Sequence, residues 1–458
     1  MEKNYIPALS AMRSWFNTGA TKPVAFRLAK LHKLKKTILD LQQEIFDALY
    51  TDLKKNQEEA WITEIGFVLA EIKIFERNLQ RWAKTETVDT NLLNFPSSSF
   101  IYKEPFGVVL IVAPWNYPFQ LLLTPFVGAI ASGNAVVLKP SEFAPATSLI
   151  MKKIIQQIFP EEYVLYVEGD GASTIPNMIT NFHFDKIFYT GSTVVGKKIY
   201  ALAASQLTPV VLELGGKSPC IVEKNAHLKA AAKRIAMAKF SNAGQMCVAP
   251  DYILAEHSIT NELIQHLEYY MKAFFGENAD QNYNYGKIIN EKHFDRLSIL
   301  LGTGEIVCGG NSIKEKLYIQ PTLMKNVSID SPIMQEEIFG PILPVLSYQS
   351  KDEAIHIINK NPDPLALYVF TSSQQDEKFW IEKIPFGGGC INNAAWHLTN
   401  DSLPFGGRGT SGMSSYHGKY SFDVFTHKKS ILKTPTWFDP AIKYPPFQGK
   451  LKWYKKIF

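Results

Sequence analysis

Three polar side chains have the types and sequence settings that covalent chemistry needs. Cys247 lies in the small-residue segment FSNAGQMCVAPDY, and a thiolate is a strong nucleophile, although a lone cysteine is more often a buried small hydrophobe. Glu213 ends the apolar run TPVVLELGG, where a carboxylate is a candidate base unless a salt bridge or solvent accounts for it. Asn116 follows another apolar run in a tight turn, where its amide could meet a ligand or could be a plain turn residue. Together the three predict a nucleophile, a base and an amide donor.

A glycine-containing segment, YTGSTVVGKK (189–198), is a candidate phosphate loop. It follows a predicted strand and opens a predicted helix, so its glycines would let the backbone approach an anion at the helix N-terminus. The segment departs from the nucleoside triphosphate loop, because Lys198 stands where serine or threonine is required. It also departs from the G-x-G-x-x-G loop, because its glycines are Gly191 and Gly196. A plain turn is an equal alternative, and Lys139, at another strand end, adds a cation to the set.

Alternating strands and helices are needed to position these residues. Short apolar runs, each ended by Gly, Pro or Ser and separated by about 20 to 30 residues, are typical of βαβ units and a parallel sheet. They are GVVLIVAP (107–114), NAVVLKPS (134–141), YVLYVEGD (163–170), FDKIFYTGS (184–192) and TPVVLELGG (208–216). A doubly wound domain is expected there. A second alternating region begins near Ala226, and the change of motif places the boundary near 213–218.

Helical periodicity dominates residues 26–82. Apolar residues recur every three or four positions, which puts them on one helix face, and a second such stretch covers 60–82. The first set is Leu28, Leu31, Leu34, Ile38, Leu41, Ile45 and Leu49. A coiled coil is the competing interpretation, but the spacing is not sustained over enough heptads. Core-facing helices are expected.

Composition excludes several classes of protein. The 458 residues are 46% hydrophobic and 20% charged, which excludes wholesale disorder and gives enough length for two or three domains. The 48 basic and 43 acidic side chains leave a formal charge of +5, too small for a nucleic-acid-binding surface. The four cysteines form no C-x-x-C pair, so neither a disulfide framework nor a metal site is expected.

The two chain ends bear on location. The N-terminal residues lack the pattern of a secretory signal, and no apolar run approaches the ~18 residues of a membrane span, so a cytoplasmic protein is expected. The last residues, QGKLKWYKKIF, interleave four lysines with aromatic residues. A solvated tail is the plain interpretation, and peripheral contact with a membrane surface is the alternative.

Seven motifs, in order along the chain, resemble the aldehyde dehydrogenase superfamily. They are APWNYP (113–118), LKPSE (138–142), YTGSTVVGK (189–197), LELGGKSP (212–219), GQMC (244–247), EEIFGPILPV (336–345) and LPFGG (403–407). The closing segment GTSGMSSYHGKYSFDVFTH looks most like the class 3 branch, which includes fatty and aromatic aldehyde dehydrogenases. The resemblance implies an α/β fold with a doubly wound cofactor-binding domain, an α/β catalytic domain and a small β bridging element.

The resemblance also implies catalytic roles. Cys247 would attack the aldehyde to give a thiohemiacetal and then a thioester. The Asn116 side chain and the Cys247 backbone N–H would stabilise the oxyanion, and Glu213 would activate the hydrolytic water. No metal is implied.

NAD is the implied cofactor, with NADP possible. Lys139 and Glu142 would face the adenosine ribose, Gly191 to Gly196 the pyrophosphate, and Glu337 with Phe339 the nicotinamide ribose and ring. Trp115 and Ser192 are further implied cofactor contacts. Glu142 would repel a 2′-phosphate and favour NAD, whereas nearby Lys139 would offset that repulsion.

The implied reaction is the oxidation of medium-to-long aliphatic or aromatic aldehydes to carboxylic acids. Tyr117, Met246 and His417 are implied substrate contacts, and the flexible apolar Met246 favours a greasy aldehyde. One alternative is a coenzyme A-acylating dehydrogenase, which would have no need of Glu213 as a water-activating base. The other is a non-catalytic binding protein of the same fold, which the presence of all three catalytic residues argues against.

The resemblance divides the chain into four parts. We expect an NAD(P)-binding domain of residues 1–80 and 105–210 and a catalytic domain of 211–390. A bridging element of 81–104 and 391–430 and a tail of 431–458 complete the chain. In this family the bridging element adds strands across a partner, so a homodimer is expected.

Overall fold

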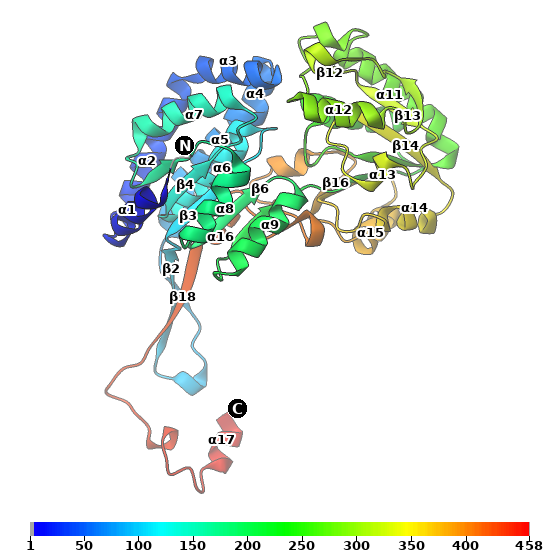
Figure 1. Ribbon diagram of the computed structural model, residues 1–458. Helices are drawn as coiled ribbons and strands as arrows, with labels where there is room; N and C mark the ends of the chain where they lie inside the picture. Colours follow the sequence, from blue (N-terminus) through cyan, green and yellow to red (C-terminus); the bar gives the residue numbers. More distant parts are fainter. Residues whose placement is uncertain (1–3, 458) are drawn as a thin grey trace.

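Two largely parallel sheets form the centres of the two lobes in Figure 1. The computed structural model describes residues 4–457. Residues 1–3 of the expected cofactor domain and residue 458 of the expected tail lie outside the described residues.

The first sheet has the strand order β17-β7-β6-β3-β4-β5, and all its strands except β17 are parallel. Its members are β3 (Val108–Val112), β4 (Ala135–Lys139), β5 (Val164–Tyr166), β6 (Lys186–Thr190), β7 (Val210–Glu213) and β17 (Gly412–Met413). Each of the five apolar runs forms one of its parallel strands. β3, β4, β5 and β6 are buried along their whole length, because helices cover both faces of the sheet. The expected doubly wound domain is confirmed.

Helices from two parts of the chain pack on this sheet (Figure 1). The N-terminal ones are α1 (Ile6–Asn17), α2 (Val24–Asp40), α3 (Gln42–Leu53), α4 (Gln57–Ala60) and α5 (Gly66–Trp82), with a π-helical turn at Trp61–Ile65. Those between strands are α6 (Pro118–Ser132), α7 (Pro145–Ile158), α8 (Gly171–Asn181) and α9 (Thr193–Ala204).

The expected single apolar face of residues 26–49 divides between two helices. Leu31, Leu34 and Ile38 are buried on α2, and Ile45 and Leu49 are buried on α3. Leu28 and Leu41 are only partly buried but pack against the same core. Because the chain bends at Leu41, the apolar positions contact a globular core and form no coiled coil.

The second sheet has the order β10-β13-β14-β9-β8-β15-β16, and only β10 is antiparallel to its neighbour. Its strands are β8 (Pro219–Val222), β9 (Tyr252–Glu256), β10 (Glu305–Cys308), β13 (Thr322–Lys325), β14 (Ile342–Tyr348), β15 (Ala366–Phe370) and β16 (Gly388–Ile391), with β11 (Ser312–Ile313) and β12 (Tyr318–Ile319) as a separate pair. Its helices are α10 (Leu228–Phe240), α11 (Thr260–Phe275), α12 (Glu291–Leu300), α13 (Pro332–Gln335), α14 (Lys351–Asn359) and α15 (Gln374–Lys383).

A three-stranded antiparallel ribbon projects from the first lobe (Figure 1). It consists of β1 (Glu86–Val88), β2 (Ser98–Pro105) and β18 (Thr426–Lys433), which α16 (Lys419–Val424) precedes. The chain then continues to α17 (Leu451–Ile457), beyond the ribbon. The division of the chain into domains stays a prediction, and the three sheets are the structural units against which it can be judged.

Candidate active site

The candidate site lies where the strand order of the first sheet reverses. From β3 the chain proceeds outward to β4 and β5, and then returns to place β6 on the other side of β3. Ligands of doubly wound sheets bind beside the carboxyl ends of the strands at such a point. Asn116 follows β3, and Gly191 follows β6. The topology therefore brings two of the predicted site segments to one crevice.

Glu213 reaches the same region from the neighbouring strand. It is the last residue of β7, and its carbonyl accepts a hydrogen bond from the Gly191 N–H at 3.0 Å. The side chain is only 2% exposed, and neither carboxylate oxygen has a hydrogen-bond partner. Burial raises the pKa of this carboxyl well above its usual value. An unpaired buried carboxyl at a strand end is typical of a functional group rather than a structural one.

Cys247 is held by a strained turn after α10. Asn242, Ala243 and Gly244 have positive φ values of 51°, 51° and 74°. Gly244 is required there, because a Cβ on it would lie 2.2 Å from the Gly340 carbonyl oxygen. The turn is anchored by Gln245, whose amide donates to the Asn242 and Lys287 carbonyls and accepts from the Ile289 N–H. Backbone strain of this kind persists only where surrounding contacts hold it.

Asn116 is tied to the cysteine loop directly. Its side chain is 2% exposed, and its Nδ2 donates to the Gln245 carbonyl at 3.1 Å. A primary amide has two N–H donors, so one is left for a ligand. Its Oδ1 has no hydrogen-bond partner. The hydrogen bond therefore ties the Asn116 amide to Gln245, which precedes Cys247 by two positions in the same loop.

An apolar cavity of about 160 Å³ is lined by two of the three catalytic candidates, and Asn116 is not part of its lining. Cys247 and Glu213 line it together, as do the three residues expected to contact substrate, Tyr117, Met246 and His417. The remaining lining is mainly apolar and includes Ile62, Phe67, Leu121, Met237, Leu398 and Phe405. The cavity therefore offers a thiol and a carboxyl to a ligand whose other end is hydrophobic.

The charges of the site oppose ionisation of the thiol. Burial raises the pKa of Cys247 to about 12, and negative charge on Glu337 and Glu213 contributes to the shift. Burial likewise raises the pKa of Glu337 to about 8. At neutral pH the protein by itself therefore holds Cys247 as a thiol and Glu337 largely as a neutral acid.

Trp115 is an expected cofactor contact, and Phe339 and Glu337 are the residues expected at the nicotinamide end. Trp115 and Phe339 are in edge contact with ring centroids 5.3 Å apart, and Phe339 has a φ of 47°. A Cβ on Gly215 would lie 1.8 Å from the Glu337 Oε2. The glycine therefore makes room for a carboxylate that interacts electrostatically with the thiol.

The residues expected at the adenosine and phosphate end also fit a dinucleotide. Lys139 ends β4, its Nζ lies 3.2 Å from the Glu142 Oε2, and its side chain is 2% exposed. Ser192 caps α9 by accepting the Val195 N–H, and α9 begins directly after the carboxyl end of β6, where a helix N-terminus can serve as an anion site. Gly196 lies buried inside α9, where a Cβ would be 2.6 Å from Leu214. Gly196 thus permits close packing of helix and strand, a known role of a glycine in such loops.

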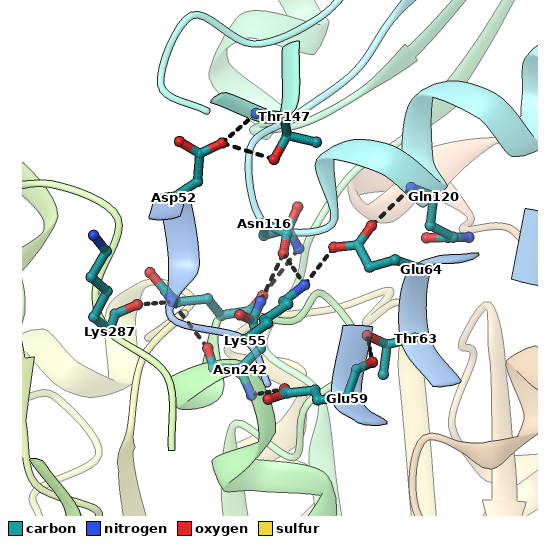
Figure 2. Close-up of polar contacts among 11 residues, drawn as sticks. Asp52, Lys55, Glu59, Thr63, Glu64, Asn116, Gln120, Thr147, Asn242 and Lys287 are labelled. Atoms are coloured by element: carbon teal, nitrogen blue, oxygen red, sulfur yellow. Dashed lines mark hydrogen bonds and ion pairs between the residues drawn. The ribbon is translucent and has the colours of Figure 1, made fainter. Parts of the chain in front are cut away.

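A buried polar cluster below the site was missed by sequence reasoning (Figure 2). Lys55 and Glu64 form an ion pair with an N–O distance of 2.6 Å, and Lys55 donates to the Asn116 carbonyl. Asn242 and Gln245 bond to Asn116 from the cysteine loop. The segment KKNQEEAWITE carries no motif, since its lysines and glutamates resemble those of any solvated helix. Only a charged residue falling on the apolar face of the helical pattern could have signalled the cluster.

Residues 4–457 contain neither a candidate metal-ligand cluster nor a helix suited to crossing a membrane. No group of three or more His, Cys, Asp or Glu side chains there could hold a metal ion. In the same part of the chain, no helix combines the length and apolarity that crossing a membrane requires.

Comparison with known proteins gives consistent matches over the whole chain. Residues 2–431 match the model of the aldehyde dehydrogenase family. The chain is 48% identical to 4,4′-diaponeurosporen-aldehyde dehydrogenase of Staphylococcus aureus, covering 97% of each chain. It is 44% identical to rat aldehyde dehydrogenase family 3 member B1, covering 96% of this chain and 94% of the relative. It is 43% identical to the mouse aldehyde dehydrogenase described as dimeric and NADP-preferring, covering 98% and 99%.

The structural comparison agrees. The fold superimposes on a substrate-bound Staphylococcus aureus AldH structure with a TM-score of 0.97, at 47% identity and with 100% of both chains covered.

Proposed function

The chain belongs to the aldehyde dehydrogenase family and is an NAD(P)-dependent enzyme that oxidises aldehydes, and from this premise we propose its mechanism and substrate class. It oxidises medium-to-long aliphatic or aromatic aldehydes to carboxylic acids through a covalent intermediate on Cys247. The observation that carries the proposal is the apolar cavity lined jointly by Cys247 and Glu213.

The first step is attack by Cys247. Its Sγ forms a bond to the aldehyde carbon and its proton passes to solvent, while the electron pair of the carbonyl π bond moves to the oxygen, which becomes negatively charged. The free N–H of the Asn116 amide and the Cys247 backbone N–H stabilise that oxygen. The mainly apolar lining of the cavity lowers the local dielectric around the thiohemiacetal, which strengthens both hydrogen bonds.

The cofactor-binding residues are Trp115, Lys139, Glu142, Gly191, Ser192, Glu337 and Phe339, with Gly196 supporting the loop. NAD(P) bound there supplies the acceptor for the hydride that leaves the substrate carbon. Trp115 and Phe339, in edge contact with each other, offer ring surface to the cofactor, and the Ser192-capped end of α9 favours a phosphate.

The second half of the reaction uses Glu213. Its two unpartnered oxygens are free to accept a hydrogen bond from a water that approaches the thioester along the cavity. Glu213 takes the proton of that water, the water oxygen attacks the thioester carbon, and the Cys247 sulfur leaves. The raised pKa of Glu213 makes it a stronger base once it is ionised.

The cavity favours a hydrophobic aldehyde. Met246 contributes a flexible thioether, and Tyr117 and His417 add ring surface beside the thiol. His417 is 6% exposed, and burial lowers its pKa to about 4, so it presents a neutral ring to the substrate. A charged aldehyde would lose its hydration here without gaining a partner.

Two rival activities make different use of the same residues. In a coenzyme A-acylating enzyme a thiol would release the thioester, and Glu213 would have no water to activate. In a non-catalytic binding protein, neither the strained Cys247 turn nor the unpaired Glu213 would be needed.

NAD is the expected preference, because Glu142 would repel a 2′-phosphate. NADP is the alternative, because the Lys139 Nζ, 3.2 Å from the Glu142 Oε2, would offset that repulsion.

The test is cofactor reduction by the purified protein with decanal or benzaldehyde, NAD and NADP being compared and coenzyme A omitted. We expect steady turnover, and no turnover in Cys247→Ala, which should keep its fold and its NAD affinity. A single burst that resumes only with coenzyme A would establish the acylating activity instead. Turnover by Cys247→Ala would show that Cys247 is not the nucleophile. If the wild type reduces no cofactor at all, the result would support the non-catalytic binding protein.

We also propose a homodimer and a cytoplasmic location. The parts of the chain proposed for the two domains, the bridging element and the tail are those set out from the sequence, with the projecting ribbon of β1, β2 and β18 as the bridging sheet. Peripheral contact of the lysine-rich tail with a membrane surface is a secondary possibility that vesicle sedimentation can test.

A further inference from the structure

Lys55 and Glu64 form a buried ion pair that no step of the proposed reaction uses. Lys55 Nζ lies 2.6 Å from Glu64 Oε1, and both side chains are 0% exposed. Removing two charges from water costs more free energy than such a pair commonly returns, so burial of this kind is weak evidence for a stabilising role. The position of the pair suggests a different use.

The pair holds both sides of the turn that presents Asn116 (Figure 2). Lys55 Nζ donates to the Asn116 carbonyl at 3.0 Å and lies 3.8 Å from the Tyr117 ring centroid. Glu64 Oε2 accepts the Gln120 backbone N–H at 2.8 Å. Gln120 lies in the first turn of α6, which has no side-chain cap of its own. The ammonium thus holds the turn before the helix, and the carboxylate holds the helix start.

The same turn is bonded to the cysteine loop. The Asn116 carbonyl accepts a second hydrogen bond, from Asn242 Nδ2 at 2.8 Å, and Asn242 Nδ2 also donates to the Gln245 carbonyl at 3.1 Å. The Asn242 backbone N–H donates to Glu59 Oε1 at 2.9 Å. Figure 2 shows these residues converging between the N-terminal helices and the site. The contacts connect three chain segments in one buried network.

We propose that Lys55 and Glu64 are positioning residues that fix the Asn116 amide relative to Cys247 when charge develops on the substrate oxygen. This inference rests on the roles proposed above for Asn116 and Cys247. Lys55 and Glu64 act through the Asn116 carbonyl and the start of α6, and they touch no reacting atom. An oxyanion donor must lie within a few tenths of an ångström of its best position, so loosening its support reduces the rate of the chemical step.

Two reagents separate positioning from general damage. With p-nitrophenyl acetate, Cys247 Sγ bonds to the acetyl carbonyl carbon and the thiol proton goes to solvent. The carbonyl oxygen carries the negative charge in the tetrahedral intermediate, which collapses with loss of p-nitrophenolate. With iodoacetamide, Sγ bonds to the methylene carbon, iodide leaves and the proton again goes to solvent, without charge on an attacked carbonyl. Only the acetylation needs the Asn116 amide, and neither reaction needs a bound cofactor.

In Lys55→Met we expect the rate of acetylation to fall about 10-fold to 100-fold, while alkylation changes less than about twofold. Glu64→Gln retains a carbonyl acceptor for the Gln120 N–H, so its acetylation rate should fall less than that of Lys55→Met. Lys55→Met/Glu64→Gln removes both charges of the pair together, so it is the variant to measure if Lys55→Met fails to fold, and it should show the same selective loss. Lys153→Met, which breaks an exposed lysine–glutamate pair, is the control and should change neither rate.

The deciding comparison is made in an Asn116→Ala background. If Lys55 acts through the Asn116 amide, Lys55→Met should cause little further loss of acetylation there, because the effects of coupled residues are not additive. A full additional loss, or an equal loss of acetylation and alkylation in Lys55→Met, would overturn the positioning role. If Asn116→Ala itself leaves acetylation unchanged, the proposed oxyanion role of Asn116 is wrong, which is a failure of the proposed function and is recognisable as such.

Discussion

At the scale of single residues, the site combines groups that burial holds in their neutral forms. Cys247 has a pKa of about 12 and Glu337 one of about 8, and burial is the leading cause of both shifts. Glu213 is buried without a partner. Burial therefore opposes ionisation of all three groups, and a bound substrate, water or cofactor that alters their surroundings would alter their pKa values.

Removal of the Glu213 base should separate the two halves of the reaction. In Glu213→Gln the amide cannot take a proton from water, so thioester hydrolysis should slow at least about 100-fold while the first turnover stays fast. Stopped-flow absorbance should show a burst of one reduced cofactor per site, followed by slow turnover. Equal loss of the burst and the steady rate would place Glu213 earlier in the mechanism.

The influence of Glu337 on the thiol should depend on pH. Glu337 is neutral below pH 8 and negative above it, and its negative charge opposes formation of the Cys247 thiolate. In Glu337→Gln, alkylation of Cys247 by iodoacetamide should match the wild type at pH 7 and exceed it by several-fold at pH 9, because one pKa unit is a factor of ten in thiolate. Cys247→Ala gives the background from the other cysteines. A ratio that does not change with pH would contradict the coupling.

At the scale of elements, turns at strand and helix ends carry the site, and two glycines in them are required for different reasons. A Cβ on Gly215 would meet only the end of the Glu337 side chain, which can move. A Cβ on Gly244 would meet the Gly340 backbone, and Gly244 also has a φ of 74°. The same substitution should therefore affect function at one position and folding at the other.

For Gly215→Ala we expect a stable protein with weakened NAD(P) binding, seen as a several-fold higher KM for the cofactor. For Gly244→Ala we expect a loss of about 2–4 kcal/mol in the free energy of unfolding, from the strained φ together with the backbone clash. Urea unfolding of both variants beside the cofactor titration checks the contrast. A large stability loss in Gly215→Ala would show that Glu337 cannot move aside.

At the scale of the whole molecule, the projecting ribbon leaves an open sheet edge. β18 pairs with β2 over eight residues, from Thr426 to Lys433, and its other edge has no partner strand among residues 4–457. All of its residues except Thr426 are exposed, including Ile431 and Leu432. Proteins usually cover such an edge, so a second copy of the chain is the expected cover.

Sedimentation should therefore give about twice the mass of one chain for the wild type. Ile431→Asp/Leu432→Asp places two like charges on the exposed ribbon and should shift the protein to monomer at micromolar concentration. Leu207→Asp, at an exposed position outside the ribbon, is the matched control and should stay dimeric. A wild-type monomer would contradict the proposed assembly.

The sequence by itself determined the parallel strands of the first sheet and the catalytic candidates. A strand buried on both faces must be apolar along its whole length, so β3, β4 and β6 are visible as continuous runs, and the polar residues at their ends stand out locally. Cys247, Glu213 and Asn116 follow from such local settings and from ordered motifs. These features can be predicted because burial of a strand and the conformation of a turn depend mainly on the types of residues adjacent in the sequence.

Only the tertiary structure decided what surrounds those residues. The bend between α2 and α3 at Leu41, and the Lys55–Glu64 pair that reaches Asn116, leave no periodic signal. Lys55 and Asn116 are 61 positions apart, and Asn242, 126 positions beyond Asn116, donates to the same Asn116 carbonyl. A buried charge looks like a solvated one in the sequence until the fold brings its partner to it, because the energy that holds it comes from contacts between distant segments.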